Sequence, residues 1–205
     1  GDSGAAIGAY YYGYLNKNSF KKNLKTENNN ILTPGFIKNK TTDEDFFLTS
    51  YVKVANKENL IEIAAELIAQ NHVIATCYRN IETGPRALGH RSMICSAHSL
   101  SAVESLNQKI KKRSKFRPVA PVTLTNNANK YFLLSEKIYQ SYFHMGAVAE
   151  VLNSKTIEAV VHKDNTSRVQ LCDENHILGK ILMKLKKHNI DVLANTSFNI
   201  SSDPM

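Results

Sequence analysis

Amphipathic helical patterns that alternate with short β-branched segments constrain the fold of this chain more than any other feature of its sequence. The clearest helical pattern begins at Lys57 and places five apolar residues on one predicted face. These residues are Leu60, Ile63, Ala64, Leu67 and Ile68. Such alternation favours an α/β (α+β) fold, in which helices flank a sheet.

Further helices and strands are expected along the rest of the chain. The sequence predicts helices over residues 100–112 and over the stretch ILGKILMKLKK, which begins at Ile177. It predicts strands over residues 72–78, 119–124, 157–162, 169–172 and 190–195. We expect the first of these strands to be buried and to lead into the turn GPRALGHRS, which begins at Gly84.

Composition limits the classes of partner. The 205 residues are 42% hydrophobic, enough for one substantial core, and they carry a formal net charge of +8. A basic chain suits nucleic acid, a membrane surface or small anions. No apolar run is long enough to span a membrane, so no membrane partner is expected. The three cysteines lack metal-finger spacing and favour a reducing, cytoplasmic setting.

Small and polar side chains gather where predicted elements end, and in three of the four segments concerned they come with arginine or lysine. The segments are GPRALGHRS, KIKKRSKFRPVAP, HKDNTSRVQ and NTSFN. Ligands of open α/β sheets bind beyond strand ends, so these segments can converge on one pocket. Together they offer a phosphate-binding set of Arg86, Arg91, Lys111, Arg113, Arg117, Arg168, Asn195 and Ser197.

Each segment also has a purely structural interpretation. The basic run can be a solvated face or a nucleic-acid patch, although the prolines after Arg117 favour a rigid strand entrance. Arg168 can pair with Asp164 across strands, and NTSFN can form an Asx-turn. A histidine such as His162 is more often structural than catalytic.

The order and spelling of these motifs resemble the carbamoyltransferases of the NodU and tobramycin-biosynthesis type. GDSGAAIGA at the start of the chain resembles the glycine-rich motif of the same family. In that family an actin-like domain is joined to a C-terminal domain resembling YrdC, with a twisted mixed sheet and flanking helices. The resemblance therefore implies that residues 1–45 are the tail of the actin-like domain with a linker. Residues 46–205 would be the YrdC-like domain, truncated at its C-terminus.

The resemblance also implies an activity, that of an ATP-dependent carbamoyltransferase. The YrdC-like part takes carbamoyl phosphate and ATP to a carbamoyl-adenylate. The actin-like part then passes the carbamoyl group to a hydroxyl of a small-molecule acceptor. Mg²⁺ accompanies ATP, and Fe²⁺ or a similar divalent metal belongs to the complete actin-like domain. This fragment alone is expected to be incomplete for full turnover.

Site residues follow from the matching motifs. The carbamoyl phosphate and nucleotide pocket is implied to contain Arg86, Arg91, Lys111, Arg117, Arg168, Asn195 and Ser197. Among these, Lys111, Arg117 and Arg168 are the implied catalytic residues. Asp2 matches the aspartate that completes the family's metal site.

The chain also departs from the family pattern around these motifs. Tyr78, Arg79 and Asn80 replace a glutamine-glycine-arginine step, although Glu82 is kept. Asn165 stands where glycine is usual, and asparagine can still adopt the left-handed conformation. An expected Asp-Pro-Arg is replaced by Ser-Ala-His, ending at His98. These changes surround the implied pocket and leave the acceptor open.

Two alternatives to catalysis remain. The chain can be a non-catalytic nucleic-acid-binding module, because it is strongly basic, or an anion sensor that has kept only the pocket. Against nucleic acid, the chain has no Trp and no aromatic stripe among its basic runs for base stacking.

Overall fold

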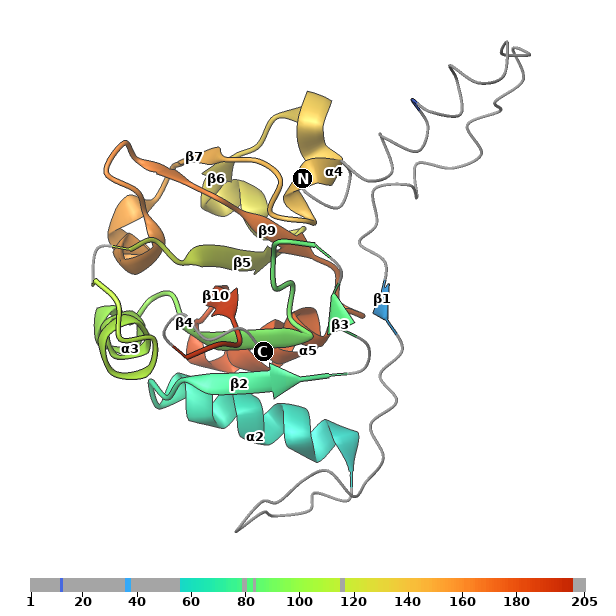
Figure 1. Cartoon of the computed structure of the whole chain (residues 1–205), viewed down its shortest axis with the longest axis vertical. Helices are drawn as coiled ribbons and strands as arrows, with labels where there is room; N and C mark the ends of the chain where they lie inside the picture. The colour runs from blue at the N-terminus through green and yellow to red at the C-terminus, as the bar shows by residue number, and fades with distance from the viewer. Residues whose placement is uncertain are drawn as a thin grey trace, which may run out of the picture.

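A mixed five-stranded sheet forms the centre of the computed structural model, which describes residues 12, 36–37, 56–78, 81–82, 84–114 and 117–200. Its strand order is β2-β4-β10-β5-β9 (Figure 1). The strands are β2 (Ile74–Cys77), β4 (Arg91–Ser96), β10 (Val192–Ser197), β5 (Ala120–Leu124) and β9 (Gln170–Cys172). Only β5 and β9 pair in parallel among these neighbours, and the other three pairs are antiparallel. The expected α/β class with a mixed sheet is confirmed.

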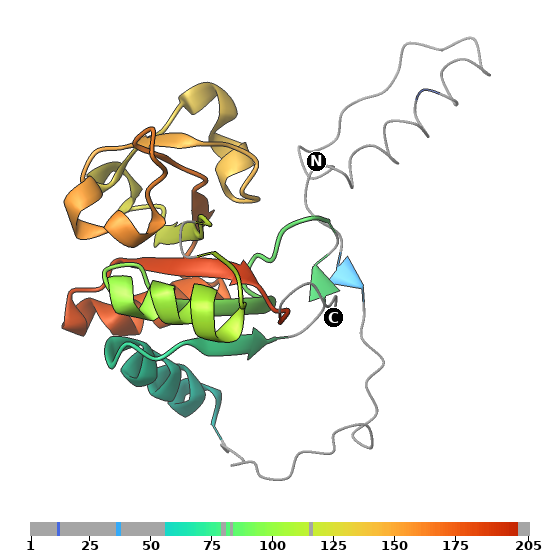
Figure 2. The same cartoon turned by 60° about the vertical axis from the view of Figure 1, so that its left-hand side comes forward.

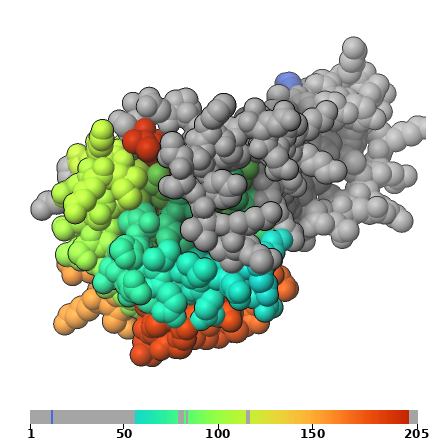
Figure 3. All heavy atoms as spheres, turned by 90° about the horizontal axis from the view of Figure 1, so that it is seen from below, coloured from blue at the N-terminus to red at the C-terminus, as the bar shows by residue number. Residues whose placement is uncertain are grey.

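Two helices, α2 (Lys57–Ala69) and α5 (Ile177–Leu185), cover one face of this sheet (Figures 1 and 2). They lie side by side on that face, as the view from below shows (Figure 3). Their buried side chains, such as Ile68 and Leu182, pack with strand residues such as Leu193 in one apolar cluster. Burial of this kind is the main stabilising force for the layer.

The opposite face of the sheet carries a second apolar cluster and a smaller sheet (Figure 2). Neighbouring residues of β4 alternate between the clusters, since Met93 and Cys95 face this one and Ile94 faces the helices. The small sheet has the order β6-β7-β8. The elements on this side are α3 (Leu100–Ser105), η3 (Leu106–Ile110), η4 (Ala128–Lys130), β6 (Phe132–Leu133), η5 (Glu136–Ile138), α4 (Tyr139–Tyr142), β7 (Ala149–Val151), η6 (Ser154–Thr156), η7 (Glu158–Val160) and β8 (Thr166–Ser167).

Two short strands, β1 (Phe36–Ile37) and β3 (Ile81–Glu82), pair with each other outside the main sheet. A 3-10 turn, η8 (Lys186–His188), extends α5. The predicted domain boundary between residues 45 and 46 lies outside the described residues.

The predicted buried face of α2 is partly wrong. Ile68 is fully buried, but Leu60, Ile63 and Leu67 are 53%, 46% and 38% exposed. The helix instead turns Ala65 and Ile68 into the core. Because apolar residues occupy more than one stripe of this helix, its periodicity allowed two orientations, and contact with the sheet and α5 selected one.

The strand predictions need three corrections. The segment 72–78 forms an edge strand in which only Thr76 is buried, so it is not a buried strand. The segment 157–162 contains the 3-10 turn η7 and no strand. The central strand β4 was not expected, because Arg91 and Ser92 were assigned to a turn that in fact ends as the strand begins.

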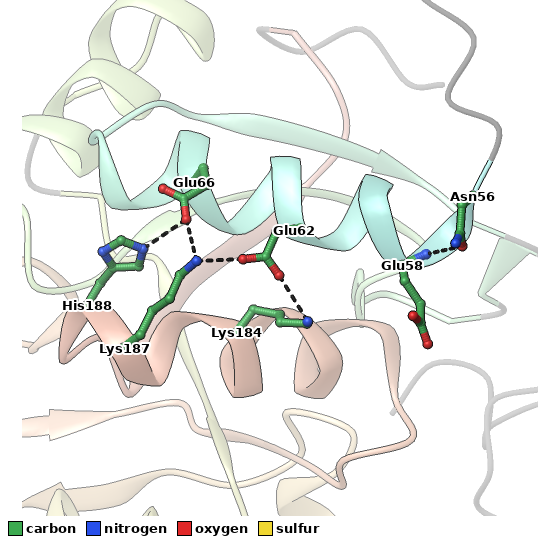
Figure 4. A network of polar contacts seen from close by, with 7 residues as sticks. All are labelled: Asn56, Glu58, Glu62, Glu66, Lys184, Lys187 and His188. Atoms are coloured by element: carbon green, nitrogen blue, oxygen red, sulfur yellow. Dashed lines mark hydrogen bonds and ion pairs between the residues drawn. The ribbon is translucent and has the colours of Figure 1, made fainter.

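Charged side chains join α2 to α5 along their exposed edge (Figure 4). The Glu62 carboxylate forms ion pairs with Lys184 and Lys187. The Glu66 carboxylate pairs with Lys187 and His188. Hydrogen bonds from Lys187 and then Lys184 lower the pKa of Glu62 from 4.5 to about 2. This network links α2 to α5 at the surface, in addition to their apolar packing.

We expect Ile68→Ala to lower the free energy of unfolding by about 2–4 kcal/mol, because it leaves a cavity beneath the sheet. Ile63→Ala, on the exposed side of the same helix, should cost less than about 1 kcal/mol. Urea denaturation of both variants measures the difference. Equal losses would contradict the orientation of α2.

The lowered pKa of Glu62 predicts an acid limb, a fall in the free energy of unfolding at acid pH. Its folded pKa of about 2 lies below its ordinary 4.5, so its contribution is present above pH 4.5 and disappears as the pH falls toward 2. Glu62→Gln should therefore flatten the stability profile in that window, most visibly at low salt. Glu58→Gln, on the first turn of α2, is the control and should leave the acid limb in place.

Candidate functional site

The loop of residues 84–91 is held by a carboxylate that binds its backbone. Glu82 accepts hydrogen bonds from the N–H groups of Leu88 at 2.9 Å and His90 at 2.7 Å, and from that of Arg91 at 3.1 Å. Several backbone donors on one carboxylate fix a turn without any partner of opposite charge. The retained Glu82 is thus the anchor of the arginine-bearing loop.

Two buried amides hold the carbonyl side of the same loop. Gln170 donates from Nε2 to the carbonyl oxygen of Leu88 at 2.9 Å. Asn195 donates from Nδ2 to the carbonyl oxygen of Ala87 at 2.9 Å and to Oε1 of Gln170 at 2.8 Å. Both amide side chains are 1% exposed, so these bonds are shielded from water.

Gly89 lets the loop approach the start of α5. Its φ is +113°, and a Cβ there would lie 2.7 Å from Cγ of Leu178 and 2.9 Å from Cε1 of His176. His176 caps α5 by accepting from the N–H of Leu178. Burial, followed by the charge of nearby His90, lowers the pKa of His176 to about 4, so its ring is neutral near pH 7.

Arg86 and Arg168 face the same region from the loop and from the segment before β9. Arg86 is exposed and Arg168 is half-buried. Burial, and then the charge of Arg86, lower the pKa of Arg168. Arg91 lies at the start of β4, where its Nη1 donates to the carbonyl oxygens of Tyr78 and His90. Three arginines therefore lie around one end of the sheet.

Lys111 is 2% exposed and lies against the end of β10. Its Nζ is 2.6 Å from the carbonyl oxygen of Ser197 and 3.0 Å from that of Asn199, and it also reaches both side chains. These acceptors are all uncharged. Burial, and then the charges of Arg113 and Arg117, lower the pKa of Lys111 from 10.5 to about 8.

Asn107 organises the two arginines that follow Lys111. Its Oδ1 accepts from Nε of Arg113 at 2.8 Å, and its Nδ2 donates to the carbonyl oxygen of Arg117 at 3.1 Å. Nη2 of Arg113 is buried and has no hydrogen-bond partner among the described residues. The Arg117 side chain is exposed.

The four predicted segments thus meet at one end of the sheet. Ser197 of β10 pairs with Ser92 of β4, and the N–H of Phe198 donates to the carbonyl oxygen of Arg91 at 3.1 Å. Because the sheet is mixed, this end holds the last residues of β10 and the first residues of β4, β5 and β9. The parallel pair therefore contributes its amino ends, not the carboxyl ends that open α/β sheets generally use.

Positive charge at this end has little acidic compensation. The chain has six arginines, and all but Arg79, which lies outside the described residues, belong to the motifs. Arg86, Arg117 and Arg168 form no ion pair with an Asp or Glu side chain among the described residues, where the ion pairs recorded join Lys130, Lys184, Lys187 and His188 to acidic partners. A site of this kind is completed by an anion.

The structural interpretations are resolved for individual residues. His162 shares a 3.1 Å hydrogen bond with Thr166, which fits a structural role. Asp164 accepts from the N–H and hydroxyl of Thr166, and within the described part of the chain it forms no ion pair with Arg168. Asn165 adopts the expected left-handed conformation with φ of 59°.

The sequence did not predict the role of Gln170 or the deep burial of Lys111 and Asn195. Gln170 is absent from the predicted set, although it is the first residue of β9 and follows Arg168 by two residues. Lys111 and Asn195 were expected to line the pocket, whereas both are almost fully buried and are bonded to the protein itself. Asp2, the predicted metal ligand, lies outside the described residues.

The described residues contain neither a cluster of metal-binding side chains nor a membrane-spanning helix. No group of three or more His, Cys, Asp or Glu side chains there is placed to hold a metal ion. Within the same residues, no helix is long and apolar enough to cross a membrane.

An α/β domain with an arginine-rich end of the sheet is typical of a protein that binds phosphorylated ligands. Residues 65–205 match the family model for the carbamoyltransferase C-terminus, so the chain belongs to that family. It is 32% identical to nodulation protein NolNO of Sinorhizobium fredii over 76% of this chain and 23% of that protein. It is 37% identical to nodulation protein U of Azorhizobium caulinodans over 68% of this chain and 25% of that protein. The chain thus spans about a quarter of these relatives, and the expected NodU-type family is confirmed.

Solved structures share the fold. Full-length HypF, in its phosphate- and nucleotide-bound form, superposes with a TM-score of 0.52 and 17% identity over 71% of this chain and 21% of HypF. Sua5 of P. abyssi, complexed with L-threonine, gives a TM-score of 0.54 and 18% identity over 75% of this chain and 42% of Sua5. The expected YrdC-like fold is confirmed by these neighbours.

The lowered pKa of Lys111 predicts that the free energy of unfolding rises with pH above about 8. Its folded pKa of about 8 lies below the ordinary 10.5, so the unfolded chain binds more protons between these values. The free energy of unfolding should therefore increase through this window relative to Lys111→Met, in which the contribution is absent. Urea titrations of both proteins between pH 7 and 11 measure the difference, and parallel curves would contradict the burial of a charged Lys111.

Proposed function

We propose that this chain provides the carbamoyl phosphate and ATP site of an O-carbamoyltransferase. There it forms a carbamoyl-adenylate for transfer to a hydroxyl of a small-molecule acceptor. The observation that carries the proposal is the convergence of Arg86, Arg91, Arg117 and Arg168 at one end of the sheet. Membership of the carbamoyltransferase C-terminus family supports the class of reaction.

Carbamoyl phosphate is a dianion, and ATP brings further phosphate charge to the same place. Guanidinium groups match phosphate oxygens in pairs and keep their charge at any relevant pH. The exposed Arg86 and Arg117, with the half-buried Arg168, are therefore assigned to the phosphate oxygens. Hydrogen bonds to Glu82, Gln170 and Asn107 hold the backbone at Leu88 and Arg117, so the segments that carry the guanidinium groups are in place before the ligand arrives, which favours stabilisation of negative charge.

Lys111 and Ser197 are assigned to the border of the pocket. Lys111 holds the carbonyl oxygens of Ser197 and Asn199, which orients the exposed Ser197 hydroxyl at the end of β10. Water would cleave carbamoyl phosphate to carbamate and phosphate, and a carbamate oxygen would attack the α-phosphorus of ATP, releasing pyrophosphate and leaving a carbamoyl-adenylate. The acceptor hydroxyl would then attack the carbamoyl carbon, with loss of its proton and release of AMP. In that sequence the chain's own residues bind and orient, and no covalent enzyme nucleophile is required.

The cofactors remain part of the proposal. Mg²⁺ is assigned to ATP and would be held mainly by phosphate oxygens. Fe²⁺ or a similar divalent metal is assigned to the complete actin-like domain, with Asp2 as one ligand. The phosphate- and nucleotide-bound form of HypF supports a nucleotide site in this fold. We also propose a cytoplasmic setting, which the free Cys77, Cys95 and Cys172 favour.

Arg168→Ala should weaken carbamoyl phosphate binding by about ten- to a hundredfold, because it removes a charge-assisted hydrogen bond that burial strengthens. Titration calorimetry with carbamoyl phosphate, and with inorganic phosphate as reference ligand, measures the loss. Lys163→Ala, an exposed cation five residues earlier in the same segment, is the matched control and should retain affinity.

Other outcomes of this titration separate the alternatives. Equal affinity of Arg168→Ala and the unsubstituted chain for carbamoyl phosphate would overturn the site. Tight RNA binding with a steep salt dependence, and no response to carbamoyl phosphate, would instead identify a nucleic-acid-binding module.

A further inference from the structure

Gln170 lies between the two strand-end segments that carry Arg168 and Arg86. It follows Arg168 by two residues, and its hydrogen-bond acceptor Leu88 follows Arg86 by two residues. The bond from Nε2 of Gln170 to the Leu88 carbonyl oxygen is 2.9 Å long and joins positions 82 residues apart. This contact therefore links the arginine before β9 to the arginine of the loop.

The orientation of the Gln170 amide is determined by its neighbours. Oε1 accepts from Nδ2 of Asn195 at 2.8 Å, while Nδ2 of Asn195 also donates to the Ala87 carbonyl oxygen. Turning either amide over would place an oxygen against a carbonyl oxygen, which is unfavourable. Gln170 pairs with Val122 of β5, and Asn195 pairs with Ala120 on its other edge. The sheet thus fixes both amides.

Arg86 and Arg168 repel each other, and this repulsion contributes to the lowered pKa of Arg168. Within the described residues neither guanidinium forms an ion pair with an acidic side chain. Contacts of the backbone segments that carry the two arginines must therefore maintain their separation. Gln170 supplies such a contact from a position that is 1% exposed, where a ligand has no access to it.

We propose that Gln170 is a positioning residue, which sets the distance between Arg86 and Arg168 so that both can hold one phosphate group. This assignment rests on the proposed function only in that the site binds a phosphate-bearing ligand. Gln170 acts through the Leu88 carbonyl and does not contact the ligand.

The test uses Gln170→Met, which keeps the length of an unbranched side chain and removes both hydrogen bonds. We expect inorganic phosphate to bind roughly tenfold more weakly, about 1.4 kcal/mol, because the bond to the Leu88 carbonyl, which links Gln170 to the arginine loop, is lost. Gln170→Asn, which keeps the amide but is one methylene shorter, should show a similar loss. Circular dichroism and thermal unfolding establish that each variant is folded.

A double-mutant cycle separates positioning from general loosening of the domain. In an Arg86→Ala background, Gln170→Met should change phosphate affinity by less than about twofold, since the pair it positions is already lost. Thr123→Val is the matched control, because Thr123 is buried in β5 and its hydroxyl donates to the Asp191 carbonyl at the opposite end of the sheet. It should lower stability without changing affinity.

The outcomes distinguish this assignment from the proposed function. Unchanged phosphate affinity in Gln170→Met, or an equal loss in both backgrounds, would overturn the role of Gln170 alone. Tenfold weakening for phosphate, with no preference of the unsubstituted chain for carbamoyl phosphate, would support Gln170 and count against the proposed function. No phosphate binding by the unsubstituted chain would overturn both.

Discussion

Repulsion between like charges at one end of the sheet is the constraint on which the candidate site depends. Arg86 and Arg168 lie close enough for the first to affect the pKa of the second, and Lys111 is affected in the same way by Arg113 and Arg117. Free guanidinium groups in water would separate. Here hydrogen bonds to the main chain tie the segments that carry them to the sheet and keep the cationic side chains near one another.

Four side chains make these hydrogen bonds to the main chain. Glu82 accepts hydrogen bonds from N–H groups of the arginine loop, and Gln170 and Asn195 donate to its carbonyl oxygens. Lys111 donates to two carbonyl oxygens at the end of β10. Each of these residues makes at least one hydrogen bond to the backbone, and the more exposed Arg86 and Arg117 face solvent. Binding and positioning are therefore divided between different residues.

Family membership places this domain within longer proteins. The chain spans 23% of NolNO and 25% of nodulation protein U, so most of each relative has no counterpart here. The acceptor hydroxyl of the proposed reaction would be selected largely by those other parts. What the described residues supply is an arginine-rich end of the sheet.

Sequence by itself determined the α/β class, the positions of α2, α3, α5, β5, β9 and β10, and the motifs that gather around the site. These features could be predicted because hydrophobic periodicity and short motifs are patterns of neighbouring residues. The start of β4 was not predicted, because Arg91 and Ser92 belong both to the end of a glycine-containing loop motif and to the first residues of this interior strand.

Only the tertiary structure decided which stripe of α2 is buried, and that Lys111, Gln170 and Asn195 are interior residues that hold the site together. The partners of Gln170 and Asn195 in the loop are 82 and 108 residues away along the chain. Periodicity carries no information over that range. Burial and hydrogen bonding of these side chains depend on which strands become neighbours, and strand order is a property of the whole fold.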